Sequence, residues 1–196
     1  QTSPEITALT EADAYPAMPE DGYGWEKLFS ERMASHFYED YGLETRVARY
    51  HNVYGPMGTY DGGREKAPAA IARKIALAKL SGDHSIDIWG DGLQTRSFMY
   101  IDDCVDGTRM MLESDIREPL NVGSSELVTI NQLVDLTEKI AGISVTRTHD
   151  LSAPQGVRGR NSDNTRILEL TNWEPSTSLQ DGMERFRGTA NAHKNL

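Results

Sequence analysis

The chain has 196 residues, of which 38% are hydrophobic and 26% charged, and its formal net charge is −10 at pH 7. This length and composition predict a globular protein of one large or two small domains, and the negative charge argues against nucleic-acid binding as its main function. No apolar run approaches the roughly 18 residues of a membrane span, and the single cysteine, Cys104, cannot form an internal disulfide. We therefore expect a cytoplasmic location.

After a polar opening segment, helical and extended patterns alternate along the chain, which is typical of an α/β fold. The predicted elements are a helix over 21–41, a strand over 45–50, a helix over 68–80, strands over 86–89 and 97–100, a helix over 102–112, a strand over 119–122, a helix over 130–141, an extended segment over 144–148, and helices over 166–170 and 178–190. Asp21 and Gly42 are the expected caps of the first helix. Asp102 or Asp103 is expected to cap the third helix, and Thr129 the fourth.

Tyr23 and Lys27 are the first candidates for catalysis. Four residues apart at the start of a helix, their side chains lie on one face, and an ammonium group beside a phenol favours the phenolate, a proton acceptor. Taken alone, such a pair is more often a half-buried aromatic residue beside a surface lysine. The rest of the sequence therefore decides which interpretation holds.

Polar residues also stand beside the predicted strands and helices, where α/β folds bind ligands. Asn52 follows the strand that ends at residue 50, and Glu65 and Lys66 precede a helix. Lys66 could act as an acid or base, or as a point charge for a phosphate. The ordinary alternatives are a turn asparagine and a solvated ion pair.

Two arginine-containing stretches could bind an anion. Gln94-Thr95-Arg96 follow a tight turn, and Arg158 and Arg160 lie in a glycine-rich loop. An arginine side chain can donate two hydrogen bonds to a phosphate, although a surface salt bridge is the alternative.

Neither a metal centre nor a cysteine nucleophile is predicted. The five histidines lack the spacing of metal ligands. Cys104 lies among apolar residues of an expected helix, where a small buried hydrophobe is the better interpretation. The sequence contains no glycine-rich dinucleotide loop and no P-loop.

Five motifs occur together in a specific order. They are Tyr23-Gly24-x-x-Lys27, Arg49-x-x-Asn52-x-Tyr54-Gly55-Pro56, Gly90-Asp91-Gly92-x-Gln94-x-Arg96-Ser97-Phe98, Tyr100-Ile101-Asp102-Asp103 and Asn121-Val122-Gly123-Ser124. In this order and at about this spacing they resemble the extended short-chain dehydrogenase/reductases of the nucleotide-sugar epimerase and dehydratase group. The stretches 62–70, 90–98 and 156–164 narrow the resemblance to the GDP-sugar epimerases of this group.

The resemblance implies an NAD-dependent isomerase that converts GDP-mannose to GDP-L-galactose by epimerisation at C3 and C5, through a transient 4-keto intermediate. Tyr23 would take the proton of the sugar's 4-hydroxyl while hydride passes to NAD, and Lys27 would assist Tyr23 and hold the nicotinamide ribose. The ketone acidifies the hydrogens at C3 and C5. Lys66 would be one of the two acid/base groups that move these protons.

The resemblance also implies a set of residues that bind the GDP-sugar. They are Asn52, Glu65, Lys66, Ala67, Lys74, Gln94, Thr95, Arg96 and Arg160. The family typically forms homodimers through helices that include the one bearing the tyrosine, so we expect a homodimer and neither a nucleic-acid nor a membrane partner. Trp25, Leu28 and Phe37 could belong to that interface or to the core.

The implied fold is the C-terminal portion of a Rossmann-type enzyme with its smaller substrate-binding domain. Residues 1–56 would be the end of the NAD-binding domain, and 57–196 mainly the substrate-binding domain, with some segments returning to the Rossmann domain. The family's dinucleotide loop and its second acid/base, a cysteine, would lie upstream of Gln1. We therefore expect the chain as given to be an incomplete, inactive part of the enzyme.

Ser97 also resembles the GDP-sugar epimerases, whereas most other relatives carry aspartate at this position. Two local departures from the family pattern are present: Asn172 stands where relatives often have glycine, and a few extra residues lengthen the loop around 79–85.

Two other functions stay open at this point. The first is a different nucleotide-sugar epimerase or a 4,6-dehydratase, which Lys66 in its glycine-rich setting disfavours. The second is a non-catalytic homologue that only binds a sugar nucleotide.

Overall fold

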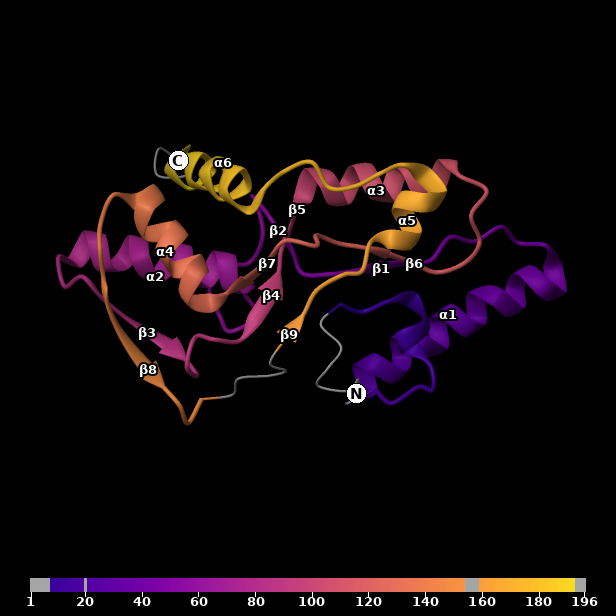
Figure 1. Cartoon of the computed structure of the whole chain (residues 1–196), viewed down its shortest axis with the longest axis horizontal. Coiled ribbons are helices and arrows are strands. Elements are labelled where there is room, and N and C mark those ends of the chain that lie inside the picture. Colours follow the sequence, from indigo (N-terminus) through magenta and orange to yellow (C-terminus); the bar gives the residue numbers. More distant parts are fainter. Residues whose placement is uncertain (1–7, 20, 154–158, 193–196) are drawn as a thin grey trace.

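The computed structural model describes residues 8–19, 21–153 and 159–192. For residues 160 and 187–192 it describes the backbone alone. The described elements are η1 (Glu11–Ala14), α1 (Gly22–Tyr41), β1 (Ala48–Tyr50), β2 (Val53–Tyr54), α2 (Ala67–Ser81), β3 (Ser85–Trp89), β4 (Thr95–Ser97), β5 (Met99–Tyr100), α3 (Ile101–Glu113), β6 (Leu120–Val122), β7 (Leu127–Thr129), α4 (Ile130–Ala141), β8 (Thr146–Asp150), β9 (Gly159–Arg160), α5 (Thr165–Thr171) and α6 (Leu179–Ala192). They form two lobes side by side along the longest axis (Figure 1).

The first lobe, drawn on the right of Figure 1, contains α1, β1, α3, β6 and α5. Strand β1 pairs in parallel with β6, and all three residues of β6 are buried. Helices α3 and α5 pack against this pair. Their core consists of Met99, Met111, Leu120, Val122 and Ile167, each at most 1% exposed.

The second lobe, drawn on the left of Figure 1, contains α2, β3, α4, β8 and α6. Strand β3 pairs in parallel with β8, and its burial alternates so that Ile86 and Ile88 face inward. Helix α2 packs against α4, and α6 packs against α4 and β5. The core of this lobe includes Ile75, Leu133 and Val134, each at most 1% exposed.

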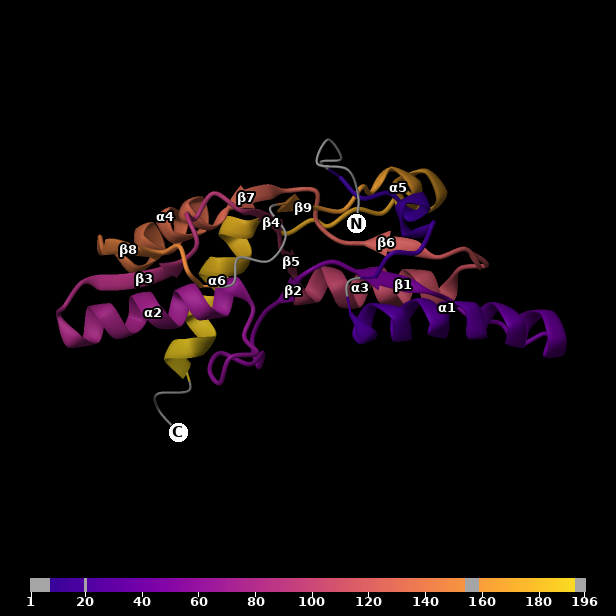
Figure 2. The same cartoon turned by 90° about the horizontal axis from the view of Figure 1, so that it is seen from below.

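Short strands join the two lobes. Strand β2 pairs in parallel with β5, and β4 lies between β7, which is antiparallel to it, and β9, which is parallel to it. The chain therefore passes between the lobes several times, and the turns that follow β1, β4 and β6 all lie near the junction (Figures 1 and 2).

Most predicted helix limits are confirmed. Asp21 is the N-cap of α1, accepting a hydrogen bond from Gly24 N at 3.0 Å, and Gly42 ends the helix at a φ of 67°. Thr129 and Gln132 form a reciprocal capping box at the start of α4.

Three predictions are wrong in detail. The strand expected over 45–50 begins only at Ala48. The strand expected over 97–100 is two strands, because β4 pairs with β7 and β9 whereas β5 pairs with β2. Helix α3 begins at Ile101 with Tyr100 as its N-cap, so neither Asp102 nor Asp103 caps it.

Asn172 ends α5 in a conformation that few residues adopt. It is the C-cap of α5 in the left-handed region, with a φ of 54°. Glycine adopts this conformation at no steric cost, and asparagine is among the side chains that tolerate it. An asparagine here is therefore compatible with the glycine that the family resemblance leads one to expect.

Candidate functional site

The residues implicated by sequence gather mainly where the two lobes meet. Helix α1 points its N-terminal end toward this junction, and α2 begins there (Figures 1 and 2). Parallel strand pairs such as β1–β6 bind ligands beyond their carboxyl ends, and Asn52 follows β1 at this position.

Tyr23 and Lys27 lie together on α1, as their spacing predicts. The ammonium nitrogen of Lys27 is 5.1 Å from the centroid of the Tyr23 ring and 3.3 Å from a carboxylate oxygen of Glu26. Tyr23 is 69% exposed, so it is not a half-buried structural aromatic within the described chain. Both polar groups can be reached by a ligand.

Asn52 connects the end of β1 to the strands at the junction. Its side-chain Nδ2 donates to Ser97 O at 3.1 Å, and its backbone carbonyl oxygen accepts from Met99 N at 3.0 Å. Asn52 is therefore held in place by the backbone between β4 and β5.

Gln94, Thr95 and Arg96 are brought next to the second arginine-containing stretch. Strands β4 and β9 pair in parallel, with Thr95 opposite Gly159 and Arg96 opposite Arg160. The side chain of Arg160 and the whole of Arg158 lie outside the described residues. The backbone register alone places the two arginine positions side by side, although they are 64 residues apart in sequence.

Glu65, Lys66 and Ala67 form the start of α2. The carboxylate of Glu65 accepts from Gly63 N at 2.8 Å, and Lys66 is the N-cap residue, whose carbonyl accepts from Ala70 N. The Lys66 side chain is exposed and has no hydrogen-bond or ion-pair partner among the described residues. Ala67 packs against the core of the second lobe.

Lys74 is held away from the other candidates by β3. Its ammonium group lies 2.7 Å from both the carbonyl and a carboxylate oxygen of Asp87. This hydrogen bond lowers the pKa of Asp87. No contact in the described part of the chain joins Lys74 to Arg96.

Among the buried polar groups at the junction, Gln94 is a predicted GDP-sugar-binding residue, whereas the others were not predicted to bind a ligand. The hydroxyls of Ser97 and Ser162, both 1% exposed, and the side-chain oxygens of Gln94, Asn161 and Asn164 lack a partner among the described residues. Buried polar groups normally have partners, including water. The polar run 161–164 directly after Arg160 was the available signal.

Gly123 lets three chain segments meet at this junction. A Cβ atom at this position would stand 2.7 Å from the Cβ of His51 and 2.9 Å from that of Ser162. Any larger residue would therefore push apart the segments that follow β1, β6 and β9.

Two further groups are unsuited to proton or nucleophilic chemistry. Burial raises the pKa of the Tyr54 hydroxyl, which donates to Leu179 O at 3.3 Å. Burial also raises the pKa of the Cys104 thiol, which agrees with its interpretation as a structural residue. Among the residues that the structure describes, no cluster of three potential ligands could hold a metal ion.

A membrane segment is likewise not found in the part of the chain that is described. None of its helices combines the length and the apolar character needed to cross a bilayer.

Comparison with known proteins agrees with the motifs. A model described as the NAD dependent epimerase/dehydratase family matches residues 2–123. The chain is 49% identical over 176 residues to GDP-mannose 3,5-epimerase 1 of Oryza sativa subsp. indica, which covers 90% of this chain and 45% of that protein. The chain thus spans about half the length of the curated relatives it matches.

Solved structures share the fold. A UDP-glucose 4-epimerase of Thermotoga maritima, solved with UDP-glucose, aligns with a TM-score of 0.82 at 29% identity, covering 90% of this chain and 55% of that one. A UDP-glucuronic acid 4-epimerase of Bacillus cereus, solved with UDP-glucuronic acid and NAD, aligns with a TM-score of 0.75 at 31% identity, covering 90% and 54%. These likenesses confirm the predicted α/β fold, and this chain covers about half of each solved chain.

Proposed function

Because the chain belongs to the NAD dependent epimerase/dehydratase family, we propose that it is part of an enzyme that epimerises GDP-mannose at C3 and C5 to GDP-L-galactose. The 49% identity to a GDP-mannose 3,5-epimerase supports this choice of substrate within the family. The structural observation that supports the proposal is that the Lys27 ammonium lies 5.1 Å from the centroid of the exposed Tyr23 ring, since these are the two residues that the family resemblance assigns to proton transfer.

The residues present fit part of an NAD site. The exposed phenol of Tyr23 and the ammonium of Lys27 lie on one helix face, where the ammonium can donate to ribose hydroxyls. NAD, when bound, accepts the hydride from C4 of the sugar and later returns it. The chain itself contains no glycine-rich loop for the pyrophosphate.

Tyr23 and Lys27 would move the first proton. The phenolate of Tyr23 takes the proton of the 4-hydroxyl as the C4–H bond breaks, which leaves a ketone at C4. The ammonium nitrogen of Lys27 lies 5.1 Å from the centroid of the Tyr23 ring, so its positive charge would oppose the negative charge that forms there during the transfer. When C4 is reduced again, Tyr23 returns the proton to the oxygen, so the pair is unchanged after one cycle.

Lys66 would act in the epimerisation that the ketone makes possible. A proton on C3 or C5 is acidic because the resulting carbanion is delocalised into the C4 carbonyl as an enolate. Lys66 has no partner among the described residues and stands at the start of α2, near the junction. Removing a proton on one face of the ring and returning it on the other needs a second group, which the family places outside this chain.

The remaining candidates would bind the GDP-sugar. The paired positions Arg96 and Arg160 would supply two guanidinium groups to the diphosphate. Asn52, Glu65, Ala67, Lys74, Gln94 and Thr95 would complete the site, and Lys74 would have to exchange its contact with Asp87 for one with the ligand. We also propose that the whole enzyme is a homodimer.

Incubation of the full-length protein with GDP-mannose and NAD, followed by NMR of the products, tests this function. We expect GDP-L-galactose, with solvent deuterium incorporated at C3 and C5 in heavy water. A 4-keto-6-deoxy sugar would instead establish a 4,6-dehydratase, and unchanged GDP-mannose would favour a non-catalytic binding protein.

Cofactor binding by the 196-residue chain alone is a separate test. We expect calorimetry to detect only weak NAD binding, because no backbone loop is available for the pyrophosphate. Tight binding would show that the Tyr23–Lys27 region holds NAD by itself.

A further inference from the structure

Two residues of the sequence motifs, Arg49 and Asn121, lie in one hydrogen-bond network beside α1. Arg49 opens the motif that contains Asn52, and Asn121 opens the motif that ends at Ser124. Neither is among the residues expected to bind NAD or the GDP-sugar. Asn121 is 3% exposed, and the side chain of Arg49 is 18% exposed. Polar side chains in such surroundings need hydrogen-bond partners, and those partners identify what each residue holds in place.

Arg49 fastens α1 to β1. Its Nε donates to one carboxylate oxygen of Glu31 at 2.9 Å, and its Nη2 donates to the other at 2.7 Å. The remaining nitrogen, Nη1, donates to Glu11 O at 2.8 Å. The side chain of Glu31 is 15% exposed, so water screens this ion pair less than one on the surface. Because each guanidinium nitrogen has a protein acceptor, Arg49 is committed to the fold and not to a phosphate.

The Arg49–Glu31 contact acts on the face of α1 that carries the proposed proton acceptor. Tyr23, Lys27 and Glu31 follow one another at four-residue spacing, so they lie along one face of the helix. Helix α1 has no buried residue, so apolar packing within the described chain does not set its orientation. Among the described residues, no other side chain of α1 forms a hydrogen bond with a strand. The contact with Arg49 therefore determines how this face is turned relative to β1.

The network continues from Glu11 to the segment that follows β9. The carboxylate of Glu11 accepts from Asn121 N at 2.8 Å. Nδ2 of Asn121 donates to Leu9 O at 2.8 Å and to Asp163 O at 3.4 Å. Leu9 N in turn donates to Asn161 O at 3.1 Å, and Leu9 O accepts from Asp163 N at 2.9 Å. Residues 161–163 directly follow β9, which ends at one of the two arginine positions proposed for the diphosphate.

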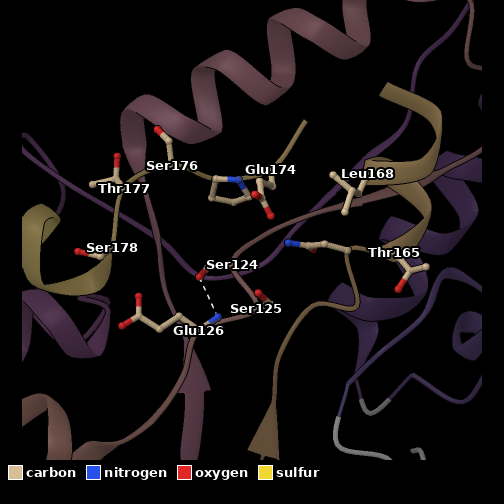
Figure 3. Close-up of a pocket in the computed structure, with 11 residues that line it drawn as sticks. Ser124, Ser125, Glu126, Thr165, Leu168, Glu174, Ser176, Thr177 and Ser178 are labelled. Atoms are coloured by element: carbon tan, nitrogen blue, oxygen red, sulfur yellow. Dashed lines mark hydrogen bonds between the residues drawn. The ribbon is translucent and has the colours of Figure 1, made fainter. Parts of the chain in front are cut away.

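Beyond this network, the segments that follow β6 and β9 stay joined. Nδ2 of Asn164 donates to Gly123 O at 2.7 Å. Figure 3 shows the next residues along each segment, with Ser125 on the one after β6 and Thr165 at the start of α5. The two segments thus form one support beside the proposed diphosphate site, and Arg49 connects α1 to it.

We propose that Arg49 is a positioning residue for the epimerisation, which sets the place of Tyr23 and Lys27 relative to the bound GDP-sugar. The proposal rests on the proposed function. Arg49 acts through Glu31 and α1, without touching NAD or the sugar. Proton transfer needs the reacting atoms within about 3–3.5 Å, and a small misplacement of a catalytic group slows a reaction strongly. A planar guanidinium that forms two parallel hydrogen bonds fixes orientation as well as distance, which the point charge of a lysine does not.

Steady-state kinetics of the full-length protein with GDP-mannose test this role. Arg49→Lys, which keeps the charge, should lower the turnover by about 10- to 100-fold and change KM by less than about twofold. Glu31→Gln should act in the same direction, and the double variant should lose no more than the worse single one, because both changes break the same contact. Arg166→Lys is the matched control. Arg166 makes a two-bond contact with Glu118 at a half-exposed site, and its substitution should leave turnover within about twofold.

Hydrogen exchange of the unliganded full-length protein, read by mass spectrometry, tests the position of α1 without using the reaction. Arg49→Lys should speed exchange of the amides of 22–35 by at least about threefold and leave those of 101–113 in α3 unchanged. Faster exchange in both helices would mean general destabilisation, and Glu31→Gln, the milder change, then decides. If the unsubstituted protein forms no GDP-L-galactose, the proposed function fails, and the exchange result alone decides whether Arg49 holds α1.

Four results would overturn the proposal. They are unchanged exchange over α1 in both variants, a raised KM with unchanged turnover, additive losses in the double variant, and an equal loss in the Arg166 control. A raised KM would instead mean that Arg49 contacts the ligand directly.

Discussion

The carboxylate of Asp103 shows how a single buried group can join distant parts of this chain. It is 4% exposed and accepts hydrogen bonds from Ser176 N and Oγ at 3.0 Å and from Thr177 N at 3.1 Å. Its sequence position suggested a helix cap, because aspartate is common there. The residues that it actually binds are 73 and 74 positions away, so no local pattern could reveal them.

Asp103→Ala is therefore expected to lower the free energy of unfolding by about 2–4 kcal/mol, since two partly buried backbone amides lose their buried carboxylate acceptor. Urea denaturation monitored by circular dichroism measures this change. Asp102→Ala is the matched control, because that neighbouring side chain is 68% exposed and should matter by less than about 0.5 kcal/mol. Equal effects of the two substitutions would contradict this account of Asp103.

Substitution of Lys66 tests its proposed role in the epimerisation step. In the full-length enzyme, Lys66→Met should reduce epimerisation by about 10²- to 10⁴-fold, the usual contribution of an acid/base group. Deuterium incorporation at C3 and C5 of GDP-mannose, read by NMR, measures it. Lys139→Met on the exposed side of α4 should retain activity, and full activity of the Lys66 variant would remove this residue from the mechanism.

At the scale of helices and strands, local signals predict the structure well and long-range pairing poorly. Asp21, Gly42 and Thr129 mark helix ends because capping depends on a few neighbouring residues. The break between β4 and β5 depends instead on which strands lie beside them, and those partners come from residues 53–54, 127–129 and 159–160. The same limit applies to the site: the Tyr23–Lys27 contact was predictable from spacing, whereas the pairing of Arg96 with Arg160 was not.

The Glu44 carboxylate links the loop before β1 to the loop before β6, and this link makes the stability of the fold depend on pH. Its carboxylate accepts from Arg117 at 3.0 and 2.8 Å and from Arg46 at 3.1 Å. These hydrogen bonds lower its pKa from 4.5 to about 2. Because the folded pKa lies below the unfolded one, the stabilisation is fully present above about pH 4.5 and is lost as the pH falls toward 2.

Arg117→Ala should raise the pKa of Glu44 toward its ordinary value, and a carboxyl-carbon NMR titration measures it. Arg109→Ala removes an arginine that pairs with Glu113 instead, so it should leave the Glu44 titration unchanged. A Glu44 midpoint that does not move in the Arg117 variant would show that this ion pair is not formed in solution.

At the scale of the whole molecule, α1 leaves a continuous aromatic surface uncovered. Trp25, Phe29, Met33, Phe37 and Tyr41 follow one another at four-residue spacing and are between 37% and 76% exposed. The sequence left open whether Trp25 and Phe37 belong to a core or an interface. Within the described chain they do not belong to a core, because α1 has no buried residue.

We expect the 196-residue chain to self-associate through this surface, since exposed apolar patches of this kind mark interaction sites. Sedimentation velocity over a range of concentrations measures it. Phe29→Glu should shift the protein toward monomer, whereas Leu112→Glu, which changes a 72% exposed leucine on α3, should not. A monomer at every concentration would refute the expectation.

The repeated crossing of the chain between its lobes has a consequence for synthesis on the ribosome. The core of the first lobe is closed by Ile167, and that of the second by Leu179 and Met183. A nascent chain emerges from its N-terminus, so the earlier strands must wait with their apolar faces uncovered until these late residues leave the exit tunnel. Neither lobe can complete its core before the other lobe has been almost entirely translated. A chaperone that shields β1 and β3 during this interval should raise the yield of folded protein.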